Sequence, residues 1–216
     1  VSKVLDLHVI NWMLKQGMTV ILVALPVVFQ PELRRALEQI GRGRFFRSGQ
    51  VISMEELERL IDEIVAISES LSKTHTGALI VFEREVGLND YIDTGIAIDG
   101  LVSRELLGNI FIPNTPLHDG AVIIRENRIM AAGCLLPLTS DRSLSTELGT
   151  RHRAAIGISE LADAVVVVVS EETGSISYTY GGHIYRHLDG NALRNVLKTF
   201  LNRTPQGLAN IFKWRP

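Results

Sequence analysis

The sequence has few of the features that would mark it as a secreted or nucleic-acid-binding protein. It holds a single cysteine, Cys134, so no disulfide can form within the chain. Cys134 lies in the apolar run 129–136, where we expect a small buried residue, which is consistent with a reducing compartment. The formal net charge of −2 provides no overall basic field for a polynucleotide. Nucleic acid is therefore disfavoured as a partner.

Two common phosphate-binding motifs are also missing. The 216 residues contain no Gly-x-x-x-x-Gly-Lys segment and no Gly-x-Gly-x-x-Gly segment. A P-loop NTPase and a dinucleotide-binding Rossmann site are therefore not supported. Any nucleotide must be held by other local groups.

Two short segments supply such groups. Residues 148–155 place two arginines and a histidine directly after Gly-Thr, where Thr150 is expected to cap a helix and leave backbone N–H groups pointing outward. Anions are attracted to such a helix end, and arginine adds a rigid fork of donors that matches phosphate oxygens. Residues 116–121 supply the carboxylate of Asp119 just before an apolar strand. Together the two segments suggest a polyphosphate site.

Each segment also has a purely structural interpretation. Asp-Gly is the commonest tight-turn dipeptide, so Asp119 alone would most often mark a turn. The Arg-His-Arg run could be a solvated helix face, although cations at a helix N-terminus oppose the helix dipole and call for a compensating anion. His118 is either a metal or phosphate contact or a loop histidine, and Glu171 and Glu172 either present ligand groups at a strand end or solvate a turn.

Hydrophobic periodicity predicts alternating helices and strands beyond Gly49. Strands are predicted at 77–83, 121–125, 128–135, 164–170 and 175–180, and helices at 54–67, 101–109, 150–161 and 189–202. Ser53 with Glu56 forms a capping box at the first of these helices. The strand at 164–170 is apolar on both faces and belongs at the centre of a sheet that is covered on both sides. The fold class is therefore α/β, with a mixed central β-sheet flanked by helices on both faces.

The N-terminal segment has the length of a membrane helix. Residues 9–29 would span about 32 Å as a helix, against a hydrocarbon core of roughly 30 Å. Their uninterrupted apolar run, 18–29, would equally suit a buried helix. Residues 31–50 then carry five arginines and two glutamates, a local net charge of +3. This matches the positive-inside pattern and predicts that the following domain lies in the cytoplasm.

Both segments, in this order, resemble the signatures of the diadenylate cyclase domain family, which carries an Asp-Gly-Ala and an Arg-His-Arg motif. The likeness extends over about residues 70–190. It includes 77–81, Thr94-Gly95-Ile96, 109–121 and 169–174. Residues 29–39, which follow the apolar segment, are similar to the membrane-anchored bacterial members. This resemblance implies a last transmembrane helix at 1–30, a basic juxtamembrane linker or helix at 31–50, a catalytic domain at 51–203 and a C-terminal tail at 204–216.

The resemblance further implies that two ATP molecules are condensed into cyclic di-AMP and two pyrophosphates, each 3′-hydroxyl attacking the other nucleotide's α-phosphorus across a face-to-face homodimer. Asp119 would activate the hydroxyl, and Mg²⁺ or Mn²⁺ would bridge phosphates with His118 as a protein contact. Substrate contacts implied in the same way are Gly77, Gly120, Ala121, Leu136, Thr150, Arg151, His152, Arg153, Ser170 and Glu171. Where relatives often place an aromatic residue beside the adenine, this chain has Leu135.

Two other functions remain open beside the cyclase. One is a catalytically silent nucleotide-binding module on a membrane tether, and the other is a metal-dependent phosphohydrolase that uses the same acid and arginines. Expected partners are ATP, a second copy of the chain, the cell membrane and, further, a regulatory protein of the membrane or cytoplasm.

Overall fold

The computed structural model describes residues 2–29, 52–141 and 148–202. The chain divides into two compact units, Val1–Val51 and Ile52–Pro216. In the first unit, helix α1 (Ser2–Val28) occupies the stretch where the sequence predicts a helix. Among the helices in the described ranges, none has both the length and the apolar character required to cross a membrane. The linker expected at 31–50 and the tail expected at 204–216 lie outside the described residues.

The second unit is built on one seven-stranded sheet, as far as the described residues show. Its strands are β1 (Ala78–Glu83), β2 (Ile96–Leu101), β3 (Ala121–Arg125), β4 (Arg128–Cys134), β5 (Val165–Val169), β6 (Ile176–Tyr180) and β7 (His183–Leu188). Their order is β2-β4-β3-β1-β5-β6-β7. Only β1 and β3 run parallel, and the other neighbouring pairs are antiparallel. The mixed sheet predicted from the sequence is confirmed.

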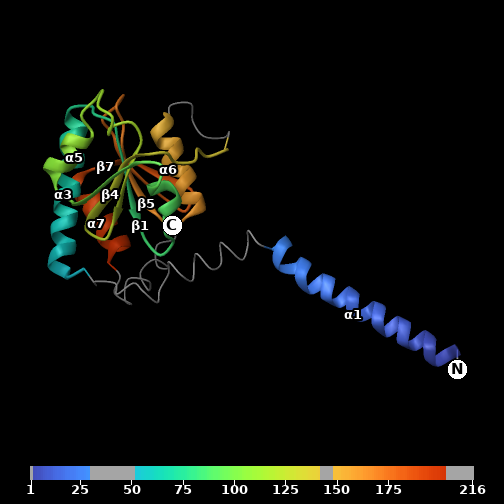
Figure 1. The fold of residues 1–216 in the computed structure, drawn as a ribbon. Coiled ribbons are helices and arrows are strands. Elements are labelled where there is room, and N and C mark those ends of the chain that lie inside the picture. The colour runs from blue at the N-terminus through green and yellow to red at the C-terminus, as the bar shows by residue number, and fades with distance from the viewer. Residues whose placement is uncertain (1, 30–51, 142–147, 203–216) are drawn as a thin grey trace, which may run out of the picture. The chain divides into compact units, whose positions relative to one another are not determined.

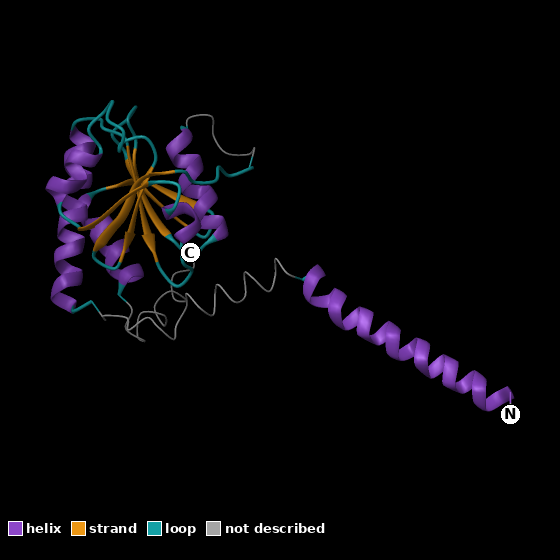
Figure 2. Ribbon diagram, in the orientation of Figure 1, coloured by secondary structure: helices purple, strands orange, loops and turns teal. Residues whose placement is uncertain are grey.

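Helices cover both faces of this sheet (Figures 1 and 2). They are α3 (Met54–Lys73), α4 (Asn89–Ile92), α5 (Arg104–Ile110), α6 (Thr150–Leu161) and α7 (Gly190–Leu201). Figure 1 shows α3, α5 and α7 on one face and α6 on the other. The predicted helix-sheet-helix layering is therefore present.

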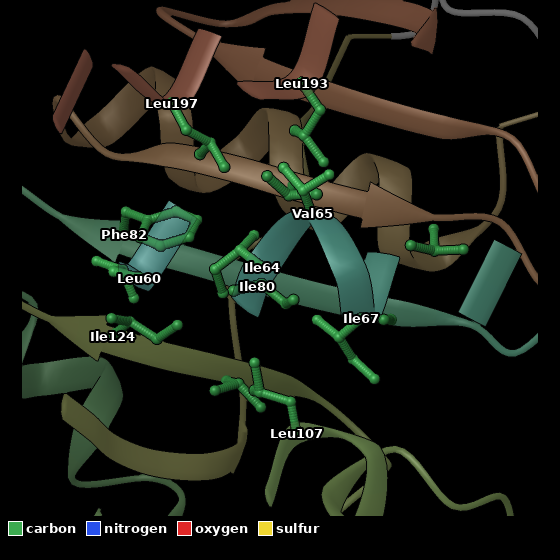
Figure 3. Packing of buried hydrophobic residues seen from close by; sticks show 14 of the residues in the cluster. Leu60, Ile64, Val65, Ile67, Ile80, Phe82, Leu107, Ile124, Leu193 and Leu197 are labelled. Atoms are coloured by element: carbon green, nitrogen blue, oxygen red, sulfur yellow. The ribbon is translucent and has the colours of Figure 1, made fainter. Parts of the chain in front are cut away.

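Two hydrophobic clusters lie on either side of the sheet, and the central strands contribute alternate residues to each. In β5, Val165, Val167 and Val169 face the cluster of α3, α5 and α7, whereas Val166 and Val168 face the cluster of α6. All five valines are fully buried. Figure 3 shows the first cluster, where α3 and α7 pack over the central strands. The strand predicted to be apolar on both faces is thus confirmed as a central one.

Helix α3 begins as its sequence predicts. The Ser53 side chain accepts from the Glu56 N–H, and the Glu56 carboxylate accepts from the Ser53 N–H, which completes the capping box. The helix is longer than expected, because its buried apolar positions continue through Leu71 and it ends only at Lys73.

Two edge strands and one helix boundary differ from the sequence-based expectation. β2 occupies residues expected as loop and helix, so α5 starts at Arg104, behind an N-cap at Ser103, and not at residue 101. β7 follows β6 through Gly181 and Gly182, both with positive φ. A Gly-Gly pair between two strands is a hairpin signal. No residue of either missed strand is fully buried, so neither carries the continuous apolar run of a central strand.

Candidate active site

A cavity of about 520 Å³ opens where the central strands of the sheet end. The residues before β3, the residues after β4 and β5 and the first turn of α6 meet there, because β4 and β5 run antiparallel to β3 and β1. Its size is that of a small-molecule site. The predicted site residues that line it are His118, Asp119, Gly120, Leu136, Thr150, Arg151, His152, Ser170 and Glu171.

Three predicted residues are not among those that line the cavity. Gly77 is buried behind it, and Ala121 is fully buried in the cluster that packs against α6. Arg153 is half-buried, and its Nε donates to the Leu148 carbonyl at 3.3 Å. Arg153 thereby braces the entry into α6.

The cavity faces the N-terminus of α6, but the cap differs from the prediction. Gly149, with extended backbone, is the N-cap, and Thr150 is the first helical residue. The N-cap glycine has no side chain that could cap this end, and the Arg153 N–H donates to the Gly149 carbonyl. Within the described residues, the N–H groups of the first turn are therefore left for a group in the cavity. Such a helix end is suited to an anion.

An ion pair joins the two walls of the cavity. Arg151 Nη1 lies 2.5 Å from Glu171 Oε2. The buried Nε of Arg151 has no hydrogen-bond partner among the described residues. A Cβ on Gly77 would lie 2.7 Å from Arg151 Nη1 and 2.9 Å from Glu171 Oε2, so a larger residue there would displace the ends of these two side chains. A buried donor without a partner favours a ligand that brings an acceptor.

His118 is held by the loop before Asp119. Its Nδ1 lies 2.6 Å from the Thr115 carbonyl oxygen, which can only accept, so Nδ1 carries the proton. In the neutral ring this leaves Nε2 as an acceptor or a metal ligand. Asp119 beside it is exposed. Its carboxylate can therefore reach a bound ligand.

The backbone of the neighbouring strand β4 requires a glycine at position 120. Its φ is +128°, and a Cβ would lie 2.7 Å from the Gly133 carbonyl carbon and 2.8 Å from the Cys134 oxygen. The resemblance assigns Gly120 and Ala121 to close approach of the nucleotide. In the structure Gly120 lines the cavity and also leaves room for the β4 backbone, whereas Ala121 is buried in the cluster that packs against α6.

Burial shifts two titratable groups on the cavity wall. It lowers the pKa of His152 below the ordinary value; the nearby Arg186 adds to this effect and Glu172 opposes it. The imidazole is thus neutral at neutral pH. Burial also raises the pKa of Cys134 to about 11, so the thiol stays protonated. The predicted burial of this cysteine is confirmed, and a nucleophilic role is disfavoured.

Seven further residues line the cavity that were not predicted as substrate, metal or catalytic residues: Leu79, Cys134, Leu135, Leu138, Gly149, Ala154 and Glu172. For Leu135 and Glu172 the sequence raises a role in the site without assigning one. Leu135 and Leu138 follow β4 and remain 68% and 53% exposed. An apolar run that continues past the end of a predicted strand is the signal that could have identified this wall. These leucines give the cavity an apolar part beside its charged groups.

The cavity therefore combines an anion-binding helix end, an accessible carboxylate and an apolar wall. This is the composition expected of a site that holds a phosphorylated molecule with a flat apolar group. The fold and site together define an α/β protein of the nucleotide-binding type.

Comparison with known proteins agrees with this class. Residues 65–184 match the family described as DAC, DisA bacterial checkpoint controller nucleotide-binding. The chain is 48% identical, over 99% of its length and 79% of the relative's, to the cyclic di-AMP synthase CdaA of Bacillus subtilis. It is 47% identical to a diadenylate cyclase of Listeria monocytogenes, over 97% of this chain and 77% of that protein. The chain belongs to the diadenylate cyclase family.

Solved structures give the same result. A cysteine double mutant of DacA from Staphylococcus aureus superimposes with a TM-score of 0.67 at 49% identity, covering 68% of this chain and 99% of that one. A hypothetical membrane spanning protein from Bacillus cereus superimposes with a TM-score of 0.57 at 46% identity, covering 59% of this chain and 62% of that one.

Proposed function

We propose that this chain is a diadenylate cyclase that condenses two ATP molecules into cyclic di-AMP and two pyrophosphates. The observation that carries the proposal is the meeting of Asp119 with the first turn of α6 in one cavity. The names of the relatives at 47–48% identity support it.

In this mechanism Asp119 accepts the proton of the attacking 3′-hydroxyl. The hydroxyl oxygen forms a bond to the α-phosphorus of the other nucleotide, and the bond to pyrophosphate breaks on the opposite side. Arg151 and the N–H groups of Thr150 and His152 stabilise the charge that develops on the leaving pyrophosphate. Since Arg153 donates to the Leu148 carbonyl, we assign it to holding this helix end in place.

The remaining lining residues suit the nucleoside end of ATP. Leu79, Leu135, Leu136 and Leu138 supply aliphatic surface for the adenine. Ser170 and Glu171 stand at the end of β5 and supply polar groups for the ribose or the base. Leu135 provides contact area without aromatic stacking, so we expect the base to gain less from this residue than from a ring.

The donor set fits a divalent cation carried by the nucleotide. Among the described side chains, no group of three or more His, Cys, Asp or Glu is arranged to hold a metal ion. His118 Nε2 is one donor on the protein side, and Mg²⁺ commonly takes its other ligands from phosphates and water. The ion would neutralise triphosphate charge. We therefore propose Mg²⁺ or Mn²⁺, with His118 as its contact on the protein side.

The exposed rim of the cavity supports a face-to-face dimer. Leu135 and Leu138 are exposed on its wall, and Ile96, at the adjoining end of the edge strand β2, is 50% exposed. Apolar side chains around a site mouth are suited to contact with a second copy. A product with two-fold symmetry demands an isologous contact, so we propose that the rims meet.

Incubation with ATP and Mn²⁺, followed by identification of the products, tests the proposed activity. Cyclic di-AMP and pyrophosphate are expected. The two alternative functions predict other results: a silent binding module yields no product, and a phosphohydrolase yields ADP and AMP. Either of these results would contradict the proposal.

We also propose that the N-terminal unit associates with the membrane, with the catalytic unit in the cytoplasm. The arginines at 31–50 and the name of the Bacillus cereus relative support this. The full chain should float with lipid vesicles, whereas a chain beginning at Gly49 should remain in the soluble fraction without detergent. Identical behaviour of the two chains in a flotation assay would show that the segment packs against protein instead.

A further inference from the structure

The apolar wall of the cavity is a short segment without strand pairing of its own. We call residues 135–139 the wall segment; it begins where β4 ends at Cys134. Its first amide is held by a side chain, because the Leu135 N–H donates to Thr94 Oγ1 at 2.9 Å. Thr94 itself does not line the cavity. It belongs to the Thr94-Gly95-Ile96 motif, to which the proposed reaction gives no role.

Thr94 is well placed to anchor this segment. Its Oγ1 donates to the Tyr91 carbonyl at 2.6 Å and accepts from the Leu135 N–H, so the hydroxyl is both a donor and an acceptor. Tyr91 lies in α4 and packs with Leu88 against the cluster under α6. The next residue, Gly95, allows close approach to β4, since a Cβ there would lie 2.5 Å from Cys134 Sγ. The anchor is therefore fixed to the core on both sides.

The far end of the wall segment is anchored to α6. The Thr139 N–H donates to the Arg153 carbonyl at 3.1 Å, and its Oγ1 donates to Glu160 Oε1 at 2.7 Å. A Cβ on Gly157 would lie 2.3 Å from the Pro137 carbonyl oxygen, so the segment lies directly on the helix. The wall segment is thus held at its first residue by Thr94, which follows α4, and at its last residue by α6, which carries the predicted phosphate site.

We propose that Thr94 is a positioning residue for the nucleotide: it sets the place of Leu135 and Leu136 so that base and phosphates fit the cavity together. The inference rests on the proposed function in that the ligand is ATP. Its effect is on binding, because Leu135 and Leu136 line the cavity and the wall segment contains no acidic or basic side chain that could transfer a proton. Its effect on stability is small, because Leu135 is 68% exposed and water can replace the lost acceptor.

The test compares Thr94→Val, which keeps the shape and removes the hydroxyl, with Thr94→Ser, which keeps the hydroxyl. The hydroxyl makes two hydrogen bonds, of which the one from Leu135 holds the wall segment. Loss of that bond, at ordinary strength, predicts about a three- to tenfold weaker affinity for a non-hydrolysable ATP analogue in Thr94→Val, and an equal rise in KM with kcat nearly unchanged. Thr94→Ser should restore both. Thr199→Val is the matched control, since Thr199 donates only to the Asn195 carbonyl within α7.

Amide hydrogen exchange of the whole chain without nucleotide separates local from global effects. Thr94→Val should speed exchange at the amides of Leu135, Leu136 and Leu138 while β1 and β5 keep their protection. Unchanged analogue affinity in Thr94→Val, or loss of protection throughout the sheet, would overturn the inference. If Thr94→Val weakens analogue binding but the unaltered protein makes no cyclic di-AMP, the positioning role stands and the proposed activity fails. If cyclic di-AMP forms and Thr94→Val binds the analogue normally, the proposed activity stands and the positioning role fails.

Discussion

Asp119→Asn is expected to lower turnover by about 10²–10⁴-fold while leaving ATP affinity nearly normal. The amide keeps the size of the carboxylate but cannot accept a proton from the 3′-hydroxyl. The side chain is exposed on the cavity wall and makes no contact that the fold needs, so the variant should fold as the original does. Steady-state kinetics with product identification, together with binding of a non-hydrolysable ATP analogue, measure the two effects separately.

A matched control for this variant is Asp90→Asn. Asp90 is also exposed, and it lies in α4, away from the residues that line the cavity. Its substitution should leave turnover within about twofold, as is usual for surface positions. If Asp119→Asn turned over at the rate of this control, Asp119 would have no part in proton transfer. A large loss of analogue affinity in Asp119→Asn would assign the carboxylate to substrate or metal binding instead.

The fold could be predicted from the sequence where the local residue pattern and the long-range packing favour the same structure. The valine run of β5 is apolar on both faces, and only a central position between two helical layers buries both. Ser53 and Glu56 determine the start of α3 by contacts three residues apart. β2 and β7 were missed because an edge strand buries one face at most. β2 in addition pairs with β4, which is distant in sequence.

The site could be predicted to the level of segments but not of individual contacts. Motifs placed Asp119, Thr150 and Arg151 in one cavity, as the structure confirms. The reasons for Gly77 and Gly120 could not be predicted, because each depends on atoms more than ten residues away: the Arg151–Glu171 pair and the β4 backbone. The helix cap was assigned one residue late, since a glycine can serve as N-cap as readily as the threonine after it.

Activity is expected to depend on a dimer, and its concentration dependence should reveal this. Each phosphodiester of the ring joins a hydroxyl of one nucleotide to the phosphorus of the other, so one protomer holding one ATP cannot close the ring. At enzyme concentrations where protomers mostly dissociate, the initial rate should rise with about the square of concentration and become linear once dimers saturate. Sedimentation at the same concentrations gives the dimer fraction for comparison.

Mixed dimers provide the sharper form of this prediction. A mixture of Asp119→Asn and Arg151→Ala protomers should not recover ring synthesis, because the two bonds together need two hydroxyl-activating groups and two phosphate clamps, whereas the mixed dimer holds one of each. At most one bond forms, so the product is at most a linear dinucleotide with the release of one pyrophosphate. If each protomer instead carried a complete site, mixing would not change the rate at all. Recovery of cyclic di-AMP synthesis in the mixture would show that one intact pair of groups closes both bonds. A rate that stays linear in enzyme where sedimentation finds only monomer would exclude the face-to-face mechanism and favour hydrolysis by a single chain.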